Sequence, residues 1–407
     1  MLLLLTASFP VFAAGEKKTT SKDPAKPAWA IPEYGEKAYN FMTETMGGYD
    51  PLAPNATELT ATAAVLMEAK SGRVLYESAS TEPRYPASMT KLMTLIVTLD
   101  AIEKGEVSLD DKVSFSEKAV AEDGTKTGYT AGATDSLRHC LEMIMVFSAN
   151  DAAYAIAEHV GGSVPAFVER MNDKAKEIGM EHTKFVNPNG LPDDKHVTTA
   201  YDMAVLGRYC TGREDVLAYT SLKSTEMEKF GTIYNSNKLL FWTEGTDGLK
   251  TGTTTAAGHC LTATAVRDDM RLIAVVMGCK KDFTHYTDAM KLLEYGFANY
   301  SLVTAVEKGE AMGKANVLYG KEDKVSLVAA EDIAFPVKNG EAAEPEIQKE
   351  IVDVEGPADI GADGGDVIVT VNGAEMGRCD LVTTEKIHKR GLFLWLKDFF
   401  SALIAGI

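Results

Sequence analysis

The chain has 407 residues and a formal net charge of −18, because 59 acidic residues outnumber 41 basic ones. A chain this acidic repels phosphate backbones, so nucleic acid is not an expected partner. Hydrophobic residues make up 45% of the sequence, which is enough for a sizeable core, and the length predicts two or three domains.

The first residues, MLLLLTASFPVFAA, form an apolar run that is typical of a secretory signal peptide over residues 1–14. Val11 and Ala13 suit the −3 and −1 positions of a cleavage site. The basic residues that usually precede such a run are missing, as expected if the signal peptide is truncated. The alternative to a signal peptide is a buried N-terminal strand. No Cys follows the run to carry a lipid, so we expect an exported protein that is not a lipoprotein.

Residues 15–60 are rich in Lys, Thr, Pro, Glu and Gly and show little periodicity, so we expect a leader that is mostly extended or disordered. Order is predicted to begin near Ala63. The segment 63–77 reads as a hairpin, and helical periodicity follows over 88–105, over 137–162 with a break at 148–150, and over 164–180. Two apolar runs, 259–268 and 270–279, predict an antiparallel strand pair, and 281–300 predicts a closing helix. These elements indicate one α/β domain whose sheet joins distant segments.

After Tyr300 the sequence changes to short β-rich runs, and Asn372-Gly373 between apolar alternations is a strong hairpin signal. We expect a small all-β domain over residues 301–384. The tail, 385–407, has a basic stripe and a broad apolar face on a helix, and its apolar part is too short and too charged to span a bilayer. It predicts an amphipathic anchor at a membrane surface, and the alternative is a helix docked on the protein itself.

Cysteine and histidine usage predicts neither a disulfide framework nor a metal site. The five cysteines are Cys140, Cys210, Cys260, Cys279 and Cys379, and no CxxC pair occurs among them. We expect buried free thiols, with a bond between Cys260 and Cys279 as the alternative, since these two lie in neighbouring predicted strands. The seven histidines lack HxxxH spacing. No cofactor or metal is therefore predicted.

The motif Ser88-Met89-Thr90-Lys91 follows Pro86, which suits a helix entry. A spacing of three places the Ser88 hydroxyl and the Lys91 ammonium on one helix face. A serine hydroxyl needs an adjacent base to become a good nucleophile, and lysine serves as that base when burial or another cation lowers its pKa. An SxxK match alone is weak evidence, because about one is expected by chance in a chain this long.

The second element is Ser148-Ala149-Asn150, at the break between two apolar helices. In an extended turn, Ser148 and Asn150 would point the same way and face a cleft. A hydroxyl there can relay a proton, and an amide can hold both a lysine and a substrate carbonyl. The alternative is an ordinary helix N-cap, a role that Ser and Asn often take.

The third element, Lys-Thr-Gly, occurs twice. Lys126-Thr127-Gly128 lies in a segment rich in Gly, Thr and Asp, which predicts an exposed loop near the mouth of the cleft. Lys250-Thr251-Gly252 leads into a predicted strand, so it suits a sheet edge where Gly252 lets a ligand approach. An edge strand can pair with an extended peptide while Lys250 and Thr251 hold a carboxylate. The context favours Lys250.

SxxK, an SDN-type motif and KTG in this order characterise penicillin-binding proteins and class A β-lactamases. The chain resembles the serine-type D-alanyl-D-alanine carboxypeptidase family, a group of low-molecular-mass penicillin-binding proteins, over roughly Ala61 to Tyr300. The resemblance lies in VLMEAKSGRVLYE, RYPASMTKLMT, FSANDAAYAIAEHVGG, KFVNPNGLPDDKHVTTAYDMAVLGRY and DGLKTGTTTAAGHCLTATAV.

The resemblance implies a penicillin-binding-protein-like α/β (α+β) catalytic domain over 61–300, with an antiparallel sheet and a helical subdomain. Ser88 would attack the bond between the two terminal D-alanines of a peptidoglycan stem pentapeptide, with Lys91 as base and Ser148 and Asn150 assisting. Lys250, Thr251, Gly252 and Thr253 would bind substrate, with an oxyanion hole formed by the backbone N–H groups of Ser88 and Thr253. β-Lactams would trap the acyl-enzyme.

The same resemblance places the protein at the extracytoplasmic face of the bacterial membrane. Relatives more often carry a larger side chain at the position of Thr253, so the substrate preference stays open. No Glu-x-x-x-Asn motif lies between Ser148 and Lys250, which disfavours a class A β-lactamase. The alternatives are a peptidoglycan D,D-endopeptidase and a sensor that is acylated without turnover.

Overall fold

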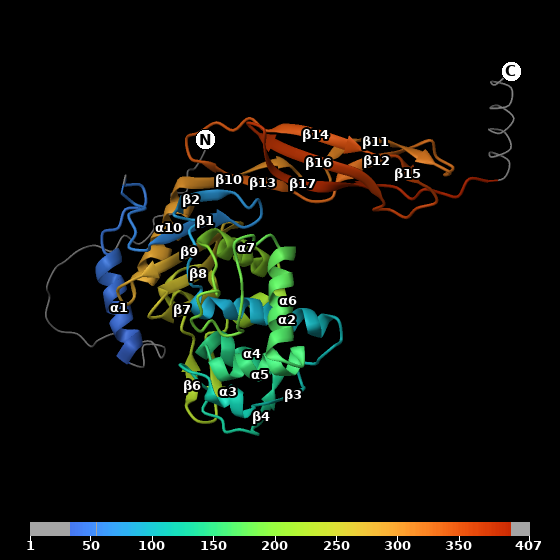
Figure 1. The fold of residues 1–407 in the computed structure, drawn as a ribbon. Helices are drawn as coiled ribbons and strands as arrows, with labels where there is room; N and C mark the ends of the chain where they lie inside the picture. Colours follow the sequence, from blue (N-terminus) through green and yellow to red (C-terminus); the bar gives the residue numbers. More distant parts are fainter. Residues whose placement is uncertain (1–32, 54, 392–407) are drawn as a thin grey trace, which may run out of the picture. The chain divides into compact units, whose positions relative to one another are not determined.

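The computed structural model describes residues 33–53 and 55–391, and its elements are labelled in Figure 1. The chain divides into two compact units. Among the described residues, the first comprises those from 33 to 64 together with 78–264 and 274–295, and the second comprises 65–77, 265–273 and 296–391.

A five-stranded sheet has the order β2-β1-β9-β8-β7. Its strands are β1 (Ala63–Glu68), β2 (Val74–Ser78), β7 (Thr246–Thr254), β8 (Gly258–Arg267) and β9 (Met270–Cys279). The predicted hairpin and the predicted strand pair are both confirmed as neighbours in this sheet. Strand β7 holds the second Lys-Thr-Gly triad and lies at one edge, as its sequence context predicted.

The predicted helices of the first unit are also present (Figure 1). They are α2 (Lys91–Glu103), α4 (Leu137–Glu142), a π-helical turn η3 (Met143–Phe147), α5 (Asn150–Gly161), α6 (Val164–Glu177) and α10 (Thr284–Asn299). Several other elements were not predicted from the sequence. The helices are α3 (Glu117–Ala121), α7 (Ala200–Thr211), α8 (Glu214–Thr220) and α9 (Leu239–Trp242). The strands form two small pairs, β3 (Lys112–Ser114) with β4 (Thr134–Ser136), and β5 (Ser224–Met227) with β6 (Gly231–Tyr234).

Helix α2 is buried on nearly every side, and this burial positions the site. Ten of its 13 residues are buried, including the polar Lys91, Thr94 and Thr98. The Thr98 hydroxyl donates to the Thr94 carbonyl at 2.8 Å, and the Thr94 hydroxyl donates to the Pro188 carbonyl at 2.6 Å. These bonds satisfy the threonine hydroxyls in the interior, as buried polar groups require.

The leader is not wholly extended or disordered, because α1 (Glu33–Met46) is a helix. Met42 is buried, and the Phe41 ring lies 5.9 Å from that of Phe283. Further along, the backbone N–H groups of Thr60 and Ala61 each donate to Asp288 at 2.8 Å. The prediction that order begins near Ala63 was wrong because partners more than 220 positions away in sequence hold this segment.

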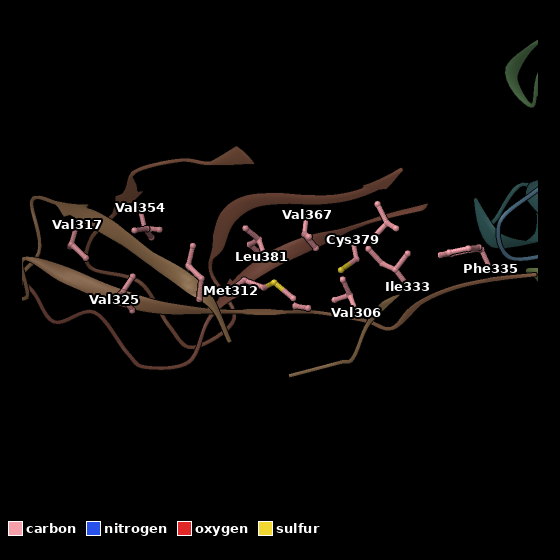
Figure 2. Close-up of a cluster of buried hydrophobic side chains, with 14 of the residues drawn as sticks. Val306, Met312, Val317, Val325, Ile333, Phe335, Val354, Val367, Cys379 and Leu381 are labelled. Atoms are coloured by element: carbon pink, nitrogen blue, oxygen red, sulfur yellow. The ribbon is translucent and has the colours of Figure 1, made fainter. Parts of the chain in front are cut away.

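The second unit is rich in β-structure, as predicted. A six-stranded sheet has the order β14-β16-β17-β12-β11-β15, and β10 pairs with β13. The strands are β10 (Tyr300–Val306), β11 (Ala311–Leu318), β12 (Lys324–Ala329), β13 (Ile333–Lys338), β14 (Glu346–Ile351), β15 (Val354–Glu355), β16 (Asp363–Val371) and β17 (Ala374–Thr383). Figure 2 shows the core between them, where Val367, Leu381 and Ile333 are among the buried side chains.

The predicted Asn372-Gly373 hairpin is confirmed. Val371 pairs with Ala374 directly across the turn, and both intervening residues have positive φ, 51° at Asn372 and 79° at Gly373. Asn and Gly tolerate this left-handed backbone better than other residues, which is why the pair is typical of two-residue hairpins.

The described start of the predicted anchor, residues 385–391, is not helical. Ile387 forms a bridge with Ala358 and is fully buried in the β core. Lys386 donates to Asp359 at 2.6 Å, and Arg390 donates to the Gly320 carbonyl at 3.2 Å. The helix prediction was wrong for these residues, because Ile387 is buried in the β core and pairs with Ala358 instead. The remainder of the anchor, 392–407, and the signal peptide, 1–14, lie outside the described residues.

Within the ranges that the structure describes, no helix is long and apolar enough to cross a membrane. All five cysteines are buried and unpaired, which confirms the expected free thiols and excludes the bond between Cys260 and Cys279. Burial raises the pKa of both of these thiols above its ordinary value.

Candidate active site

The structure joins Ser88 and Lys91 directly. Ser88 lies in a 3₁₀ turn, η2 (Ala87–Thr90), that runs into α2, and Lys91 is the first residue of α2. Their side chains are in hydrogen-bond contact, with 2.9 Å between Lys91 Nζ and Ser88 Oγ. The predicted spacing therefore gives the expected contact, although the turn is tighter than an α-helix.

The Lys91 amine is enclosed and has two further partners. Its Nζ donates to Asn150 Oδ1 at 2.6 Å and to the Asn189 carbonyl at 2.7 Å. Burial, followed by the nearby Lys250 ammonium, lowers the pKa of Lys91 well below its ordinary value. Once the amine has lost a proton, its two remaining N–H groups can serve the Asn150 and Asn189 oxygens, and its lone pair can accept from the Ser88 hydroxyl. The arrangement is suited to a general base.

Asn150 reaches Lys91 from an unusual break between helices. The π-turn η3 ends at Ser148, which has φ 66° and ψ 34°, and Asn150 then begins α5. The prediction of an extended turn was therefore wrong, because the π-turn closes with Ser148 in the left-handed region. The alternative of a Ser or Asn side-chain N-cap is also wrong, because Ala149 occupies the cap position. The Asn150 amide instead donates to the Asp123 carbonyl at 2.6 Å.

Strand β7 supplies the second lysine. Lys250 is 1% exposed, and burial lowers its pKa to about 7. Thr251 Oγ1 lies 2.8 Å from Ser236 Oγ. A Cβ on Gly252 would lie 2.9 Å from both the Pro86 carbonyl oxygen and the Ser88 nitrogen. Only glycine therefore allows β7 to lie this close to the Ser88 turn.

Two hollows meet at Ser88. One, of about 920 Å³, is lined on its polar side by Ser88, Ser148, Thr251, Gly252 and Thr253, together with Lys238 and His285. The other, of about 520 Å³, is lined by Ser88, Asn150, Asn189 and Thr253 among others. Six of the eight predicted site residues thus line these hollows. The other two, Lys91 and Lys250, are buried, with exposed fractions of 0% and 1%.

The first Lys-Thr-Gly copy lies beside the cleft but is not simply an exposed loop. Thr125 lines both hollows, as expected of a position near the cleft mouth. Thr127 is buried, and its hydroxyl donates to Asp151 at 2.6 Å. The Asn150 N–H donates to the Thr125 carbonyl at 2.7 Å. The copy therefore holds the start of α5, which carries Asn150.

The Asn189-Gly190 turn also contributes to the site and was not predicted from the sequence. The Asn189 side chain donates to Glu122 at 2.6 Å, while its carbonyl accepts from Lys91. Gly190 has φ 88°, and a Cβ on it would lie 1.9 Å from the Ala87 carbonyl oxygen. The segment NPNG carried only a turn signal.

Two known families match successive parts of the chain. Residues 50–281 match the family described as D-alanyl-D-alanine carboxypeptidase. Residues 300–389 match the family described as penicillin-binding protein 5, C-terminal domain.

Individual relatives agree. The chain is 34% identical over 345 residues to the D-alanyl-D-alanine carboxypeptidase DacF of Bacillus subtilis, covering 83% of this chain and 88% of that protein. Penicillin-binding protein 5 of Haemophilus influenzae is similar in structure, with a TM-score of 0.68, 32% identity, and coverage of 81% and 98%. Penicillin-binding protein D2 of Listeria monocytogenes in its cefotaxime-bound form matches 59% of this chain and 98% of its own, with a TM-score of 0.55 and 33% identity.

Proposed function

This chain belongs to the D-alanyl-D-alanine carboxypeptidase family, and from that premise we propose that Ser88 is its acylated nucleophile and Lys91 its general base. The family membership confirms the predicted enzyme class, a D-Ala-D-Ala carboxypeptidase. The observation that carries the residue assignment is the contact of 2.9 Å between Lys91 Nζ and Ser88 Oγ, with the other Lys91 partners on Asn150 and Asn189.

In acylation, the Ser88 oxygen attacks the carbonyl carbon of the penultimate D-alanine, and the hydroxyl proton passes to the neutral Lys91 amine. The developing oxyanion accepts hydrogen bonds from the backbone N–H groups of Ser88 and Thr253. The close approach of β7 at Gly252 supports this pairing, because it holds the two backbones together. Collapse expels the terminal D-alanine, whose nitrogen takes a proton from Lys91 directly or through Ser148.

In deacylation, a water molecule attacks the acyl carbonyl, and Lys91 accepts a proton from the water. The bond between the acyl carbon and the Ser88 oxygen then breaks, and Lys91 returns the proton to that oxygen. The same oxyanion donors serve both steps. Asn150 holds the Lys91 amine through its Oδ1, so it keeps the base aligned during both transfers.

Substrate binding is assigned to the edge strand β7. No strand of the described residues neighbours its outer side in the five-stranded sheet, so an extended stem peptide can add to it by main-chain hydrogen bonds. Lys250 supplies positive potential to the terminal carboxylate, while Thr251 and Thr253 provide hydroxyl groups at the cleft wall. A β-lactam fits the same assignment as an acylating analogue.

The enzyme acts outside the cytoplasm, and we assign residues 392–407 as its anchor on the membrane surface. The supporting observation is in the sequence, where Leu392, Trp395, Leu396, Phe399, Phe400 and Leu403 share one helical face. Removal of 392–407 leaves the β-sheet contacts of Ile387 intact. The truncated protein should pass from the membrane fraction to the soluble fraction, and continued membrane binding would refute the assignment.

The activity is tested by free D-alanine release from a stem pentapeptide ending in D-Ala-D-Ala. Wild type should release D-alanine and Ser88→Ala should not. Mass spectrometry after incubation with a penicillin should place one acyl group on the peptide that contains Ser88. Acylation elsewhere would overturn the nucleophile assignment. Cross-linked muropeptide dimers included in the assay would reveal an endopeptidase, and acylation without D-alanine release would indicate a sensor.

A further inference from the structure

Both amide residues that hold the Lys91 amine are fixed in turn by one short segment, residues 122–123. The Asn150 side chain, whose Oδ1 accepts from Lys91, donates through Nδ2 to the Asp123 carbonyl at 2.6 Å. The Asn189 carbonyl also accepts from Lys91, and the Asn189 side chain donates through Nδ2 to Glu122 Oε2 at 2.6 Å. Two consecutive residues after α3 therefore each hold one partner of the base.

The contact between Glu122 and Asn189 fixes the orientation of the Asn189 amide. Asn189 is 1% exposed, and its Oδ1 accepts from the Leu191 backbone N–H at 3.1 Å. A carboxylate can only accept and a backbone N–H can only donate, so a flipped amide would lose both hydrogen bonds. Asn189 is thus held from two sides while its backbone carbonyl oxygen lies 2.7 Å from Lys91 Nζ.

The charge around Lys91 is divided between one cation and two carboxylates. Burial, followed by the Lys250 ammonium, lowers the pKa of Lys91, whereas Asp151 and Glu122 raise it. In the described part of the chain, neither carboxylate is a hydrogen-bond partner of the Lys91 amine, so both anions act on it through space. His196, which bonds the residue before Lys91, is uncharged near neutral pH because burial lowers its pKa to about 4.

The two carboxylates differ in their other contacts. Asp151 is 1% exposed and accepts from the N–H and the hydroxyl of Thr127 and from the Ala152 N–H. Glu122 is partly buried, and burial raises its pKa while the hydrogen bond from Asn189 lowers it. The other ionisable groups that interact with Glu122 are Asp123, Lys91, Asp151 and Tyr154. A substitution at Glu122 therefore changes one contact and one charge, whereas one at Asp151 would also release Thr127.

We propose that Glu122 is a positioning residue for the general base. Its carboxylate keeps the Asn189 carbonyl on Lys91, and its negative charge favours the ammonium ion that forms when Lys91 takes the Ser88 proton. Without such an anion, that proton transfer would place a second buried cation beside Lys250. Of the described residues, those that line the two hollows at Ser88 do not include Glu122, so it acts through Asn189 and through its charge. The inference rests on the proposed function, because that function assigns Lys91 as the base.

The test is the pH dependence of acylation in Glu122→Gln. Glutamine has the same shape and keeps an oxygen for the Asn189 amide, but it carries no charge. The second-order rate of acylation by a fluorescent penicillin should begin to rise at a pH lower by on the order of half a unit, because loss of a nearby anion makes Lys91 easier to deprotonate. The plateau rate should fall by roughly tenfold or less, since a weaker base accepts the Ser88 proton less readily. A profile that superimposes on wild type, or a lower plateau with no shift along the pH axis, would overturn the inference.

Two further substitutions separate the charge from the contact. Glu122→Asp keeps the charge and shortens the side chain by one methylene, so the rise should stay at the wild-type pH while the plateau falls, because Asn189 is held less firmly. Glu117→Gln is the matched control, since it makes the same chemical change at an exposed position of α3, and its profile should equal that of wild type. A Glu122→Asp profile displaced as far as that of Glu122→Gln would contradict the role of the charge.

A second readout does not depend on catalysis. The protonation of Lys91 is followed by NMR in protein labelled with ¹³C at the lysine Cε atoms, and the Lys91 signal is identified by its absence from Lys91→Arg. The midpoint of its titration should lie at lower pH in Glu122→Gln than in wild type, and equal midpoints would refute the inference. A wild-type protein that releases no D-alanine and is not acylated at Ser88 would refute the proposed function, whereas the two midpoints would still decide whether Glu122 sets the proton affinity of Lys91.

Discussion

Gly252 on β7 lies against Ser88, so that a Cβ on Gly252 would stand 2.9 Å from the Ser88 backbone nitrogen. Contacts this short are essentially never made by a real Cβ. The two segments are 164 positions apart in the chain, by subtraction of 88 from 252. Their approach sets the distance between the nucleophile turn and the edge strand, and glycine at 252 is what permits it.

Gly252→Ala should therefore impair acylation more than stability. The added methyl group pushes β7 away from the Ser88 turn, and removal of one well-placed oxyanion donor costs about 10²–10³ in rate in other enzymes. We expect the second-order rate of penicillin acylation to fall by about 10²-fold, measured with a fluorescent penicillin. Gly212→Ala is the matched control. A Cβ on Gly212 would lie 3.6 Å from its nearest neighbour, so this variant should be acylated at the wild-type rate. Gly48→Ala would not serve, because Gly48 has a positive φ.

Lys91→Arg should abolish most activity although it keeps a cation at that position. Arginine does not lose its proton, so it cannot accept the Ser88 proton. A fall of about 10²–10⁴-fold in acylation rate is expected for loss of a general base. In wild type, acylation should rise with pH to a plateau reached far below the pH at which ordinary lysine titrates, because burial lowers the pKa of Lys91. An arginine variant with the wild-type rate would contradict the role.

The two Lys-Thr-Gly copies should differ sharply in activity. Lys250→Ala should lower kcat/KM for the peptide by about 10²-fold or more, because a buried charge beside the carboxylate is lost. Lys126→Ala should retain most activity, since within the described ranges Lys126 donates only to the Val120 carbonyl, at 3.1 Å. D-alanine release measured on both variants decides the matter, and the reverse order would show that the first copy carries the site.

Lys250 should also destabilise the fold in a pH-dependent way. Burial lowers its pKa to about 7 in the folded protein, whereas an unfolded lysine titrates near about 10.4. Between pH 7 and pH 10, Lys250 is protonated more often in the unfolded chain than in the folded one. The free-energy cost of burying the charged side chain is therefore full below pH 7 and falls as the pH rises toward 10.

Lys250→Met should therefore raise the Tm by several degrees at pH 6.5, and its advantage over wild type should shrink by pH 9.5. Thermal unfolding at both pH values tests the prediction. Lys126→Met serves as the control and should show no comparable pH-dependent gain. A Lys250→Met variant that is less stable than wild type at pH 6.5 would contradict the burial penalty.

Local pattern was sufficient for much of this molecule. The β1–β2 hairpin, α2, the β8–β9 pair and the Asn372-Gly373 turn all follow from short-range periodicity and turn chemistry. The choice of Lys250 over Lys126 as the edge-strand copy also came from neighbouring residues, because only the second copy leads into an apolar strand.

Segments held by distant partners were not predictable in this way. Helix α1 has a polar composition, yet Met42 and Phe41 find partners on the first unit. Residues 385–391 have the periodicity of an amphipathic helix, yet Ile387 completes a β core. Propensity is a weak prior, and tertiary packing overrides it in both places.

The sequence by itself determined the set of chemical groups, Ser88, Lys91, Ser148, Asn150 and Lys250, and the order in which they occur. Tertiary structure decided what these groups can do. Burial in the interior lowers the pKa of Lys91, the π-turn before Ser148 directs Asn150 to it, and the Asn189-Gly190 turn provides its third hydrogen-bond partner. Hydrogen-bond distance and desolvation depend on segments that meet only in the folded chain, so no local pattern encodes them.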